Sequence, residues 1–366
     1  MKILLFVKSK YYTYGGPAYV CKIFKSLLTN NIKKNIEVDI NDEKDIKLLN
    51  QKELINKISQ YDLVSIHGIW SLKNSLIAKI CRKCLIPYII SLHGMLDPWS
   101  WKKNFFFKVI YYLTFLKKDL KYASSVHCLN NFELELTKKF LKKKNIFIFE
   151  NVLENKNYTF DPGRLKKKIS GKLDILYFSR ITKKKGLEKF LKVISGVKKD
   201  FFIKIIGPSN TSEDQKYLKK LKELTYELKL TENVKFYDAV GNNYKKSMTL
   251  SSADLFILPS SQEGDPIVLK ESIFHGVPLL ITRNCKFEVS YNNKTFGYFL
   301  NEDFSNAKKI LERLIDMDNK SYEQLKKNAI TYSKKFLSND KKTNELNLIF
   351  ENIIRSKDNN NFIYIK

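Results

Sequence analysis

The chain lacks any uninterrupted apolar run of the roughly 20 residues that a membrane-spanning helix needs. Its opening segment, residues 1–8, contains an apolar run too short for a secretion signal, and no small-residue cleavage site follows it. We therefore predict a first buried strand there, and a soluble or membrane-peripheral protein of the cytoplasm.

Cysteine is also scarce, with five residues in 366 and no spacing typical of a disulfide framework. An odd number without such spacing predicts a reducing, cytosolic environment. Cys81 and Cys84 form a C-x-x-C motif, but no second such pair and no neighbouring histidine pair completes a zinc site. We interpret both as small buried hydrophobic residues of a helix.

Acidic residues are few beside the basic ones, since 38 Asp and Glu accompany 66 Lys and Arg for a formal charge of +28. Such an excess favours anionic partners. The lysines are spread along the whole chain, however, and no helix-turn-helix, zinc-finger, RNP or KH motif accompanies them. We predict affinity for an anionic surface and no nucleic-acid partner.

Apolar runs alternate with amphipathic stretches from end to end, which predicts βαβ units and parallel sheets with helices on both faces. The predicted strands span 3–7, 37–40, 63–67, 88–93, 125–129 and 146–149, then 175–178, 202–206, 234–237, 255–258 and 279–282. The predicted helices include 18–28, 72–84, 104–121, 131–143, 186–197, 213–229 and 267–275, with terminal helices over 306–355.

A polar stretch over 154–172 interrupts this alternation and has the composition of an interdomain linker. Because 366 residues are many for one core, we predict two domains, residues 1–155 and 156–334. The predicted fold class is therefore α/β, with two Rossmann-like, doubly wound domains. The carboxyl ends of their strands would face a cleft between them.

Gly15 and Gly16 follow the first predicted strand. Paired glycines let the backbone approach a ligand closely and leave amides free for phosphate oxygens. The G-x-G-x-x-G spacing of a dinucleotide fingerprint is absent. On its own, the pair is more typical of an ordinary turn.

Two His-Gly steps, at His67 and His93, end predicted strands in a chain that has only four histidines. A histidine at a strand end can donate to substrate oxygens or transfer protons. A structural hydrogen bond to the backbone is the alternative, and we favour it more for His67 than for His93.

Arg180 and Lys185 follow the first strand of the second half. A guanidinium supplies a fork of donors and an ammonium a point charge, which together suit a pyrophosphate. A solvated basic loop is the alternative, and we expect Lys183 and Lys184 to be only that.

Glu263 and Glu271 stand eight positions apart, before and inside the predicted helix 267–275, and Gly207 ends another strand. A strand, a tight loop and a helix direct backbone N–H groups and a positive dipole end at an anion. The two carboxylates would hold separate hydroxyl-rich parts of a phosphate-bearing ligand. Two solvated glutamates of an ordinary βα unit are an equally good interpretation of this segment alone.

In their order along the chain, these features resemble the retaining GT-B glycosyltransferases of family 4, or group 1, over nearly the whole length. The resemblance rests on Gly15-Gly16, the Ser-Leu-His-Gly-Met-Leu-Asp-Pro segment around His93, Arg180 with Lys185, and the Glu-x7-Glu motif. Ser272 departs from the family, which commonly has Ala there.

The resemblance implies a nucleotide-sugar donor, whose diphosphate Arg180 and Lys185 would bind. Glu263 would hold the transferred sugar, Glu271 the ribose, and His93 would face the reacting sugar on the acceptor side. Donor-binding positions implied in this way are Gly15, Gly16, Gly207, Pro266, Ile267, Val268 and Glu271, where Pro266 has no N–H. A C-terminal helix within 335–366 would return to the first domain.

No Asp-x-Asp stands at a predicted strand end to hold a metal ion. Fixed cations, helix-start amides and the helix dipole would therefore neutralise the departing diphosphate. We predict a hexosyltransferase that needs neither metal nor cofactor and transfers the sugar on the front face. By family habit, the acceptor would be a glycan or a lipid-linked glycan of surface polysaccharide biosynthesis.

Two other classes remain open. A nucleotide-sugar epimerase on the same fold would use its carboxylates as acid and base and need no acceptor. A basic module that binds nucleic acid or anionic lipid would show salt-sensitive binding that survives loss of Glu263 and Arg180. We favour it less, because the charge does not concentrate in a recognisable motif.

Residues 99–118 interleave aromatic side chains with lysines, including Trp99, Trp101 and Lys108. A basic aromatic helix can lie in an anionic lipid interface, which predicts docking at the inner face of a membrane. In the alternative interpretation, the helix packs its apolar face on the sheet and its lysines rim that contact.

Overall fold

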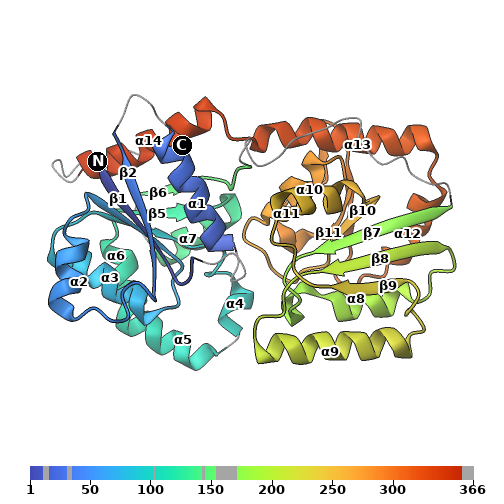
Figure 1. The fold of residues 1–366 in the computed structure, drawn as a ribbon, viewed down its shortest axis with the longest axis horizontal. Coiled ribbons are helices and arrows are strands. Elements are labelled where there is room, and N and C mark those ends of the chain that lie inside the picture. Colours follow the sequence, from blue (N-terminus) through green and yellow to red (C-terminus); the bar gives the residue numbers. More distant parts are fainter. Residues whose placement is uncertain (11–15, 31–34, 103, 142–144, 154–170, 357–366) are drawn as a thin grey trace. The chain divides into compact units, whose positions relative to one another are not determined.

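The computed structural model describes residues 1–10, 16–30, 35–102, 104–141, 145–153 and 171–356. The chain divides into two compact units, the first Met1–Val152 with Ser338–Lys366 and the second Leu153–Leu337. Each unit has its own hydrophobic core. The last helix, α14 (Asp340–Arg355), belongs to the first unit and packs beside α1 (Gly16–Thr29) (Figure 1).

The first unit contains a six-stranded parallel sheet in the order β2-β1-β3-β4-β5-β6. Its strands are β1 (Lys2–Val7), β2 (Glu37–Asp42), β3 (Leu63–His67), β4 (Tyr88–Ser91), β5 (Ser125–Cys128) and β6 (Ile146–Ile148). Its other helices are α2 (Gln51–Ile58), α3 (Leu72–Lys83), α4 (Pro98–Lys102), α5 (Phe105–Tyr111), the π-helical turn η2 (Tyr112–Leu116), α6 (Lys117–Tyr122) and α7 (Asn131–Phe140).

The second unit contains another six-stranded parallel sheet, in the order β14-β11-β10-β7-β8-β9. Its strands are β7 (Lys172–Phe178), β8 (Asp200–Ile206), β9 (Val234–Tyr237), β10 (Leu255–Leu258), β11 (Leu279–Thr282) and β14 (Gly297–Leu300), beside a hairpin of β12 (Ser290–Tyr291) and β13 (Lys294–Thr295). Its helices are α8 (Leu187–Ile194), α9 (Ser212–Glu227), α10 (Asn243–Ser251), α11 (Ile267–Phe274), α12 (Ala307–Asp316) and α13 (Asn319–Ser333), with the 3₁₀ turns η5 (Lys183–Lys185), η6 (Arg283–Cys285) and η7 (Lys334–Phe336).

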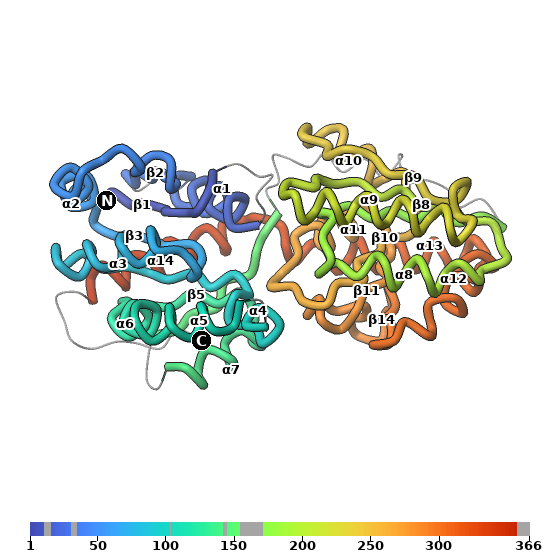
Figure 2. Tube along the Cα trace, turned by 90° about the horizontal axis from the view of Figure 1, so that it is seen from below, coloured from blue at the N-terminus to red at the C-terminus, as the bar shows by residue number. Residues whose placement is uncertain are grey.

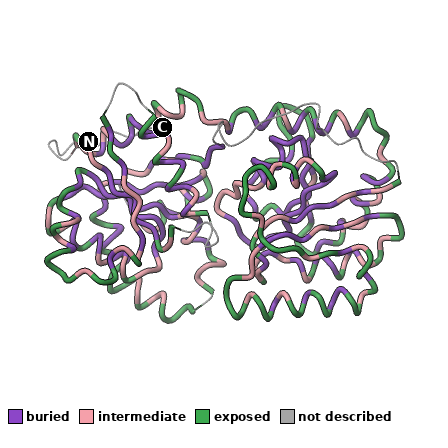
Figure 3. Tube along the Cα trace, in the orientation of Figure 1, coloured by how far each residue is buried: buried purple, intermediate pink, exposed green. Residues whose placement is uncertain are grey.

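The burial pattern is the one that parallel sheets show. Strands β3, β4, β10 and β11 are buried at every residue, as a sheet covered on both faces requires (Figure 3). In the second unit, α8, α9 and α12 lie on one face of the sheet and α10, α11 and α13 on the other (Figures 1 and 2). The predicted α/β architecture of two doubly wound, Rossmann-like halves is confirmed.

The strand order reverses direction at one place in each sheet. In the first unit the reversal lies between β1 and β3, and in the second between β7 and β10. Open α/β sheets bind ligands at the carboxyl ends of the strands beside such a switch point. Residues that follow β1, β3, β7 and β10 are therefore the first candidates for a functional site.

The structure differs from the sequence-based prediction in several details. The single helix expected over 104–121 is divided into α5, η2 and α6, and the helix α2 and the strand β14 were not predicted. The expected linker overlaps β7 at Lys172, and the rest of it, 154–170, lies outside the described residues. Of the C-x-x-C pair, Cys81 is buried as predicted, whereas Cys84 is half-buried. Within the described ranges, no helix has the length and apolarity to cross a bilayer.

Candidate functional site

In the second unit, an ion pair joins the loops that follow β7 and β10. Lys185 is buried, and its Nζ donates to Oε1 of Glu263 at 2.6 Å. Burial acts to raise the pKa of Glu263, but the charges of Lys185 and Lys184 and the hydrogen bond from Lys185 hold it below its ordinary value. An ionised carboxylate and an ammonium thus lie together at the switch point of this sheet.

Two glycines allow the loops of this unit to approach closely. Gly186 has φ +73°, and a Cβ placed there would lie 2.0 Å from the carbonyl oxygen of Pro259. Gly207 has φ +158°, and a Cβ there would lie 1.9 Å from the carbonyl oxygen of Ser179. The approach of Gly186 to Pro259 places Lys185 beside the end of β10. The approach of Gly207 to Ser179 places the end of β8 beside the residue before Arg180.

The three other basic side chains of this loop differ in environment. Arg180 is exposed, and its guanidinium makes no hydrogen bond or ion pair with the described part of the chain, although its carbonyl accepts from Tyr177 Oη at 2.6 Å. Lys183 is exposed, as predicted. For Lys184 the structure differs from the expected solvated side chain, because it is half-buried and its charge acts on Glu263.

Glu271 lies on α11 and is fully buried. Nζ of Lys246, on α10, lies 2.6 Å from Oε1 and 2.5 Å from Oε2 of this carboxylate. Sequence reasoning missed Lys246, because a lone lysine on a helix is normally solvated. Since each carboxylate oxygen has two lone pairs, Glu271 retains acceptor capacity beyond this ion pair.

A second buried ion pair fixes the loop between the two glutamates. Nζ of Lys270, only 1% exposed, donates to Oδ2 of Asp265 at 2.6 Å and lies 4.5 Å from the ring centroid of Phe336. Pro266 caps α11, so the first amides of that helix, at Ile267 and Val268, have no acceptor within the helix. Sequence reasoning missed this pair, in which Asp265 lies just before α11 and Lys270 is the fourth residue of that helix.

In the first unit, His93 follows β4 in a left-handed conformation, with φ +54°, and Gly94 has φ +73°. A non-glycine residue in this region is uncommon and requires support from its surroundings. The buried carboxylate of Glu133, on α7, supplies it by accepting hydrogen bonds from the backbone N–H of Gly94 and, at 2.7 Å, of Leu129. Glu133 therefore joins the loops that follow β4 and β5.

Three of the four histidines meet beneath this turn. Nδ1 of His67 lies 2.9 Å from Nε2 of His93, and Nε2 of His67 lies 3.1 Å from Oγ of Ser65. Nε2 of His127 faces the carbonyl oxygen of Phe149 at 2.9 Å and must carry the proton, so Nδ1 accepts from Ser91 Oγ. For His67, a side-chain partner replaces the backbone partner that we expected.

Burial keeps these imidazoles neutral. It lowers the pKa of His93 to about 3 and that of His127 to about 4, and it holds that of His67 well below its ordinary value. His93 is half-buried, whereas His67 and His127 are buried, so His93 is the one of the three that a ligand can reach. A neutral imidazole can donate one hydrogen bond and accept another.

Of the predicted glycine pair, Gly16 begins α1 and is exposed, whereas Gly15 lies outside the described residues. Within the described ranges, no three His, Cys, Asp or Glu side chains are grouped to hold a metal ion. Whether the protein works without a metal stays a prediction.

Two side chains of the aromatic segment after His93 pack within the first unit, and docking of this segment on a membrane stays a prediction. The ring of Trp101 packs against Trp70 and Phe140, with centroids 5.0 and 6.1 Å away. Lys108 donates through Nζ to the carbonyl oxygen of Ser100 and lies 5.1 Å from the ring centroid of Trp70. Both side chains are therefore engaged inside the unit.

Comparison with known proteins bears on the second unit and on the fold. Residues 163–334 match the family described as glycosyl transferases group 1. No curated protein matches the chain. Sucrose-phosphate synthase from Thermosynechococcus elongatus is 12% identical with a TM-score of 0.76, and the match covers 97% of this chain and 100% of that one.

Two further solved structures are similar. HepE of Anabaena, in complex with UDP and glucose, is 17% identical with a TM-score of 0.74, covering 97% of this chain and 100% of HepE. WaaG, a glycosyltransferase involved in lipopolysaccharide biosynthesis, is 13% identical with a TM-score of 0.68, covering 97% and 99%. The fold is GT-B. At these identities the likeness establishes the GT-B fold.

Proposed function

We propose that the protein is a retaining glycosyltransferase that moves a hexose from a nucleotide-diphosphate sugar to a hydroxyl acceptor. The observation that carries the proposal is the Lys185–Glu263 ion pair at the switch point of the unit that matches glycosyl transferases group 1. A paired cation and carboxylate offer one group for a phosphate and one for sugar hydroxyls.

Arg180 and Lys185 bind the diphosphate in this proposal, since the guanidinium of Arg180 makes no ion pair within the described chain and Lys185 is held in place by Glu263. The first amides of α11, at Ile267 and Val268, and the backbone of Gly207 and Gly16 add donors or close approach. Glu271 accepts from the ribose hydroxyls, and Lys246 fixes its orientation.

The reaction breaks the bond between the anomeric carbon and the departing phosphate oxygen. The acceptor oxygen forms its new bond to that carbon on the same face, which preserves configuration. The acceptor proton passes to the phosphate oxygen that leaves. Fixed positive charge near the diphosphate stabilises it as negative charge develops, without a metal ion. Glu263 hydrogen-bonds the sugar, and neutral His93 orients the acceptor side.

UDP-glucose is the first donor to test, because HepE has been seen with UDP-glucose. A glycan or lipid-linked acceptor of surface polysaccharide biosynthesis fits the likeness to WaaG, which is involved in lipopolysaccharide biosynthesis. With such an acceptor, the sugar transfer would take place at the cytoplasmic face of the membrane.

Thermal-shift titration with UDP-, GDP-, ADP- and CMP-sugars tests the donor site. One of them should raise Tm in a concentration-dependent way, because a ligand that binds only the folded state stabilises it. If none does, the donor-site assignment fails. Incubation of the active donor without an acceptor tests the alternative class, because an epimerase alone would convert the sugar.

A further inference from the structure

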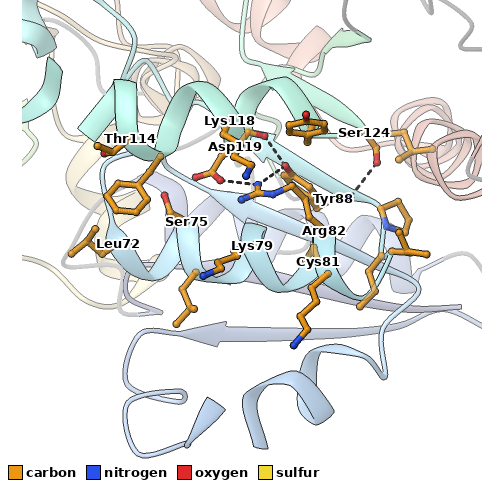
Figure 4. Close-up of a pocket in the computed structure, with 18 of the residues that line it drawn as sticks. Leu72, Ser75, Lys79, Cys81, Arg82, Tyr88, Thr114, Lys118, Asp119 and Ser124 are labelled. Carbon is orange, nitrogen blue, oxygen red and sulfur yellow. Dashed lines mark hydrogen bonds and ion pairs between the residues drawn. The ribbon is translucent and has the colours of Figure 1, made fainter. Parts of the chain in front are cut away.

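A wide groove crosses the first unit between α3 on one side and η2 with α6 on the other (Figure 4). We call it the α3–α6 groove; its volume is about 1100 Å³. Apolar side chains form much of its wall, among them Leu72, Leu76, Leu85, Ile86, Phe115 and Tyr122. Leu72, which lines it, is the first residue of α3.

An internal ion pair neutralises the polar floor of the groove. Nη1 of Arg82 donates to Oδ1 of Asp119 at 2.7 Å and to Oη of Tyr88 at 3.0 Å (Figure 4). Tyr88 in turn donates to the carbonyl oxygen of Asp119 at 2.7 Å. The floor therefore presents no net charge to a ligand.

The rim of the groove is positive. Lys79, Lys83 and Lys118 line it with exposed side chains. Their ammonium groups make no hydrogen bond or ion pair with the described part of the chain. Three lysines beside a neutral floor favour an anionic group at the edge of an apolar channel.

Exposed apolar side chains continue from the groove along α5 and η2. Phe106, Phe107, Ile110 and Leu113 are 80%, 78%, 61% and 62% exposed. Phe106, Ile110 and Leu113 follow helical spacing, and the next residues of η2, Thr114 and Phe115, line the groove. We call these four side chains the α5–η2 face. Contiguous exposed apolar groups of this kind mark an interaction surface.

We propose that the α3–α6 groove and the α5–η2 face together bind an anionic lipid of a bilayer. The α5–η2 face enters the interface, the lipid chain lies along the apolar wall of the groove, and the lipid phosphate pairs with Lys79, Lys83 and Lys118. The proposal deepens the proposed function, because it would hold a lipid-linked acceptor beside the unit that carries His93, but its test needs no sugar transfer.

Charge and shape distinguish this occupant from three others. A second copy of the chain would bring the same lysines to the contact. A nucleic acid would satisfy the lysines but leave the aliphatic groups of Ile110 and Leu113 without an apolar partner. The chain's own segment 357–366 carries two lysines and one aspartate, so it offers no anionic complement to the rim.

Vesicle co-sedimentation of the full chain tests the inference. We expect at least tenfold stronger binding to vesicles of phosphatidylcholine with phosphatidylglycerol than to phosphatidylcholine alone, and a loss of this preference at about 0.5 M NaCl. K79E/K83E/K118E should abolish the preference. F106S/I110S should weaken binding to the anionic vesicles at least tenfold at low salt, because it removes apolar side chains that enter the interface. Its charge is unchanged, so such a loss would not be electrostatic.

The matched control is K216E/K222E/K309E, which makes the same charge change on exposed lysines of the second unit and should bind as the wild type does. Thr114→Trp fills the groove and should reduce uptake of a labelled phosphatidylglycerol while vesicle binding remains. Equal loss in both triple variants would mean that only net charge matters and would overturn the proposal.

Two measurements separate the other occupants. Removal of residues 357–366 should leave lipid uptake unchanged, and a severalfold gain would assign the groove to that segment instead. Sedimentation should show no dimer that F106S/I110S dissociates, since such a dimer would assign the α5–η2 face to a second copy. If vesicle binding holds while no sugar is transferred, only the proposed transfer fails.

Discussion

His67 Nδ1 lies 2.9 Å from His93 Nε2, and the two imidazole rings stack with their centroids 5.1 Å apart. Only one proton can lie between the two nitrogens. Burial first, and then the neighbouring imidazoles, lower the pKa of both rings, so the pair is neutral. His67 thereby fixes the ring orientation of His93, whose backbone already adopts an uncommon conformation.

This arrangement predicts instability in acid. The pKa of His127 is about 4 in the folded chain, against an ordinary value of 6.5, and the pKa values of His67 and His93 are also lowered. The unfolded chain therefore binds more protons below pH 6.5, and stability is lost as pH falls from there towards 4. Linkage gives about 1–2 kcal/mol per histidine between pH 7 and pH 5.

Urea unfolding followed by tryptophan fluorescence measures this loss in the first unit, because all three tryptophans, Trp70, Trp99 and Trp101, lie there. His127→Gln should lower the free energy of unfolding at pH 7 and make it less dependent on pH. An unchanged pH dependence in that variant would contradict the assignment of a neutral His127.

Arg180→Ala and Lys185→Ala should each lower kcat/KM by about 10²-fold or more, as expected for groups aimed at developing charge. The control is Lys183→Ala, because Lys183 is exposed, whereas Lys184 acts on Glu263. Equal, mild losses in all three variants would indicate a solvated basic loop.

Lys185→Ala also leaves Glu263 buried without its cation, which costs stability as well as activity. Adding Glu263→Gln to Lys185→Ala should recover Tm, whereas kcat/KM should stay well below that of Glu263→Gln alone. If the double variant equals Glu263→Gln in kcat/KM, the lysine acts only through folding.

The two glutamates should show different defects. Glu263→Gln should lower kcat, because it contacts the sugar that changes in the transition state. Glu271→Gln should weaken nucleotide binding by about 1–3 kcal/mol, the range for a lost buried hydrogen bond to a charged group. Isothermal titration with the free nucleotide separates the two, and unchanged affinity in Glu271→Gln would remove the ribose assignment.

Glu133→Gln should destabilise the first unit by about 1–3 kcal/mol, because an amide cannot accept from both Gly94 and Leu129 when its NH₂ group faces one of them. We expect kcat/KM to fall as well, since the His93 turn loses its support. Glu135→Gln, on the same helix but exposed, is the matched control. Equal Tm values for the two variants would show that the turn does not depend on Glu133.

Much of the fold was predictable because both sheets are buried on both faces. Strands such as β3 and β10 are continuous apolar runs, and the helices between them have a clear period. The break at η2 was not predictable, because the apolar spacing of 104–121 continues through it. Strand β14 was missed because it is only four residues long, begins with a glycine and shows no alternation of apolar and polar residues.

Some residues of the candidate site were likewise predictable from the sequence and others were not. Glu263 and Lys185 were identified because each follows a strand end, and the parallel order brings such ends together. Lys246, the partner of Glu271, and Glu133, which accepts from Gly94 and Leu129, were not identified, since each lies on a helix and has a residue type that is usually solvated there. Only packing decides that such a side chain is buried and paired.

The first unit is completed only by the last helix. Phe350 of α14 packs on Phe24 of α1 with ring centroids 6.0 Å apart, and Asn347 lies against the carbonyl oxygen of Leu27. During synthesis on the ribosome, the part of α1 that contacts α14 therefore stays exposed until the whole second unit has been made. Leu153 and Leu337, where the chain enters and leaves that unit, pair as parallel neighbours. The second unit can thus fold first, as an inserted domain. Once its two ends are paired, α14 starts close to the place where the chain left the first unit, and it can then pack on α1.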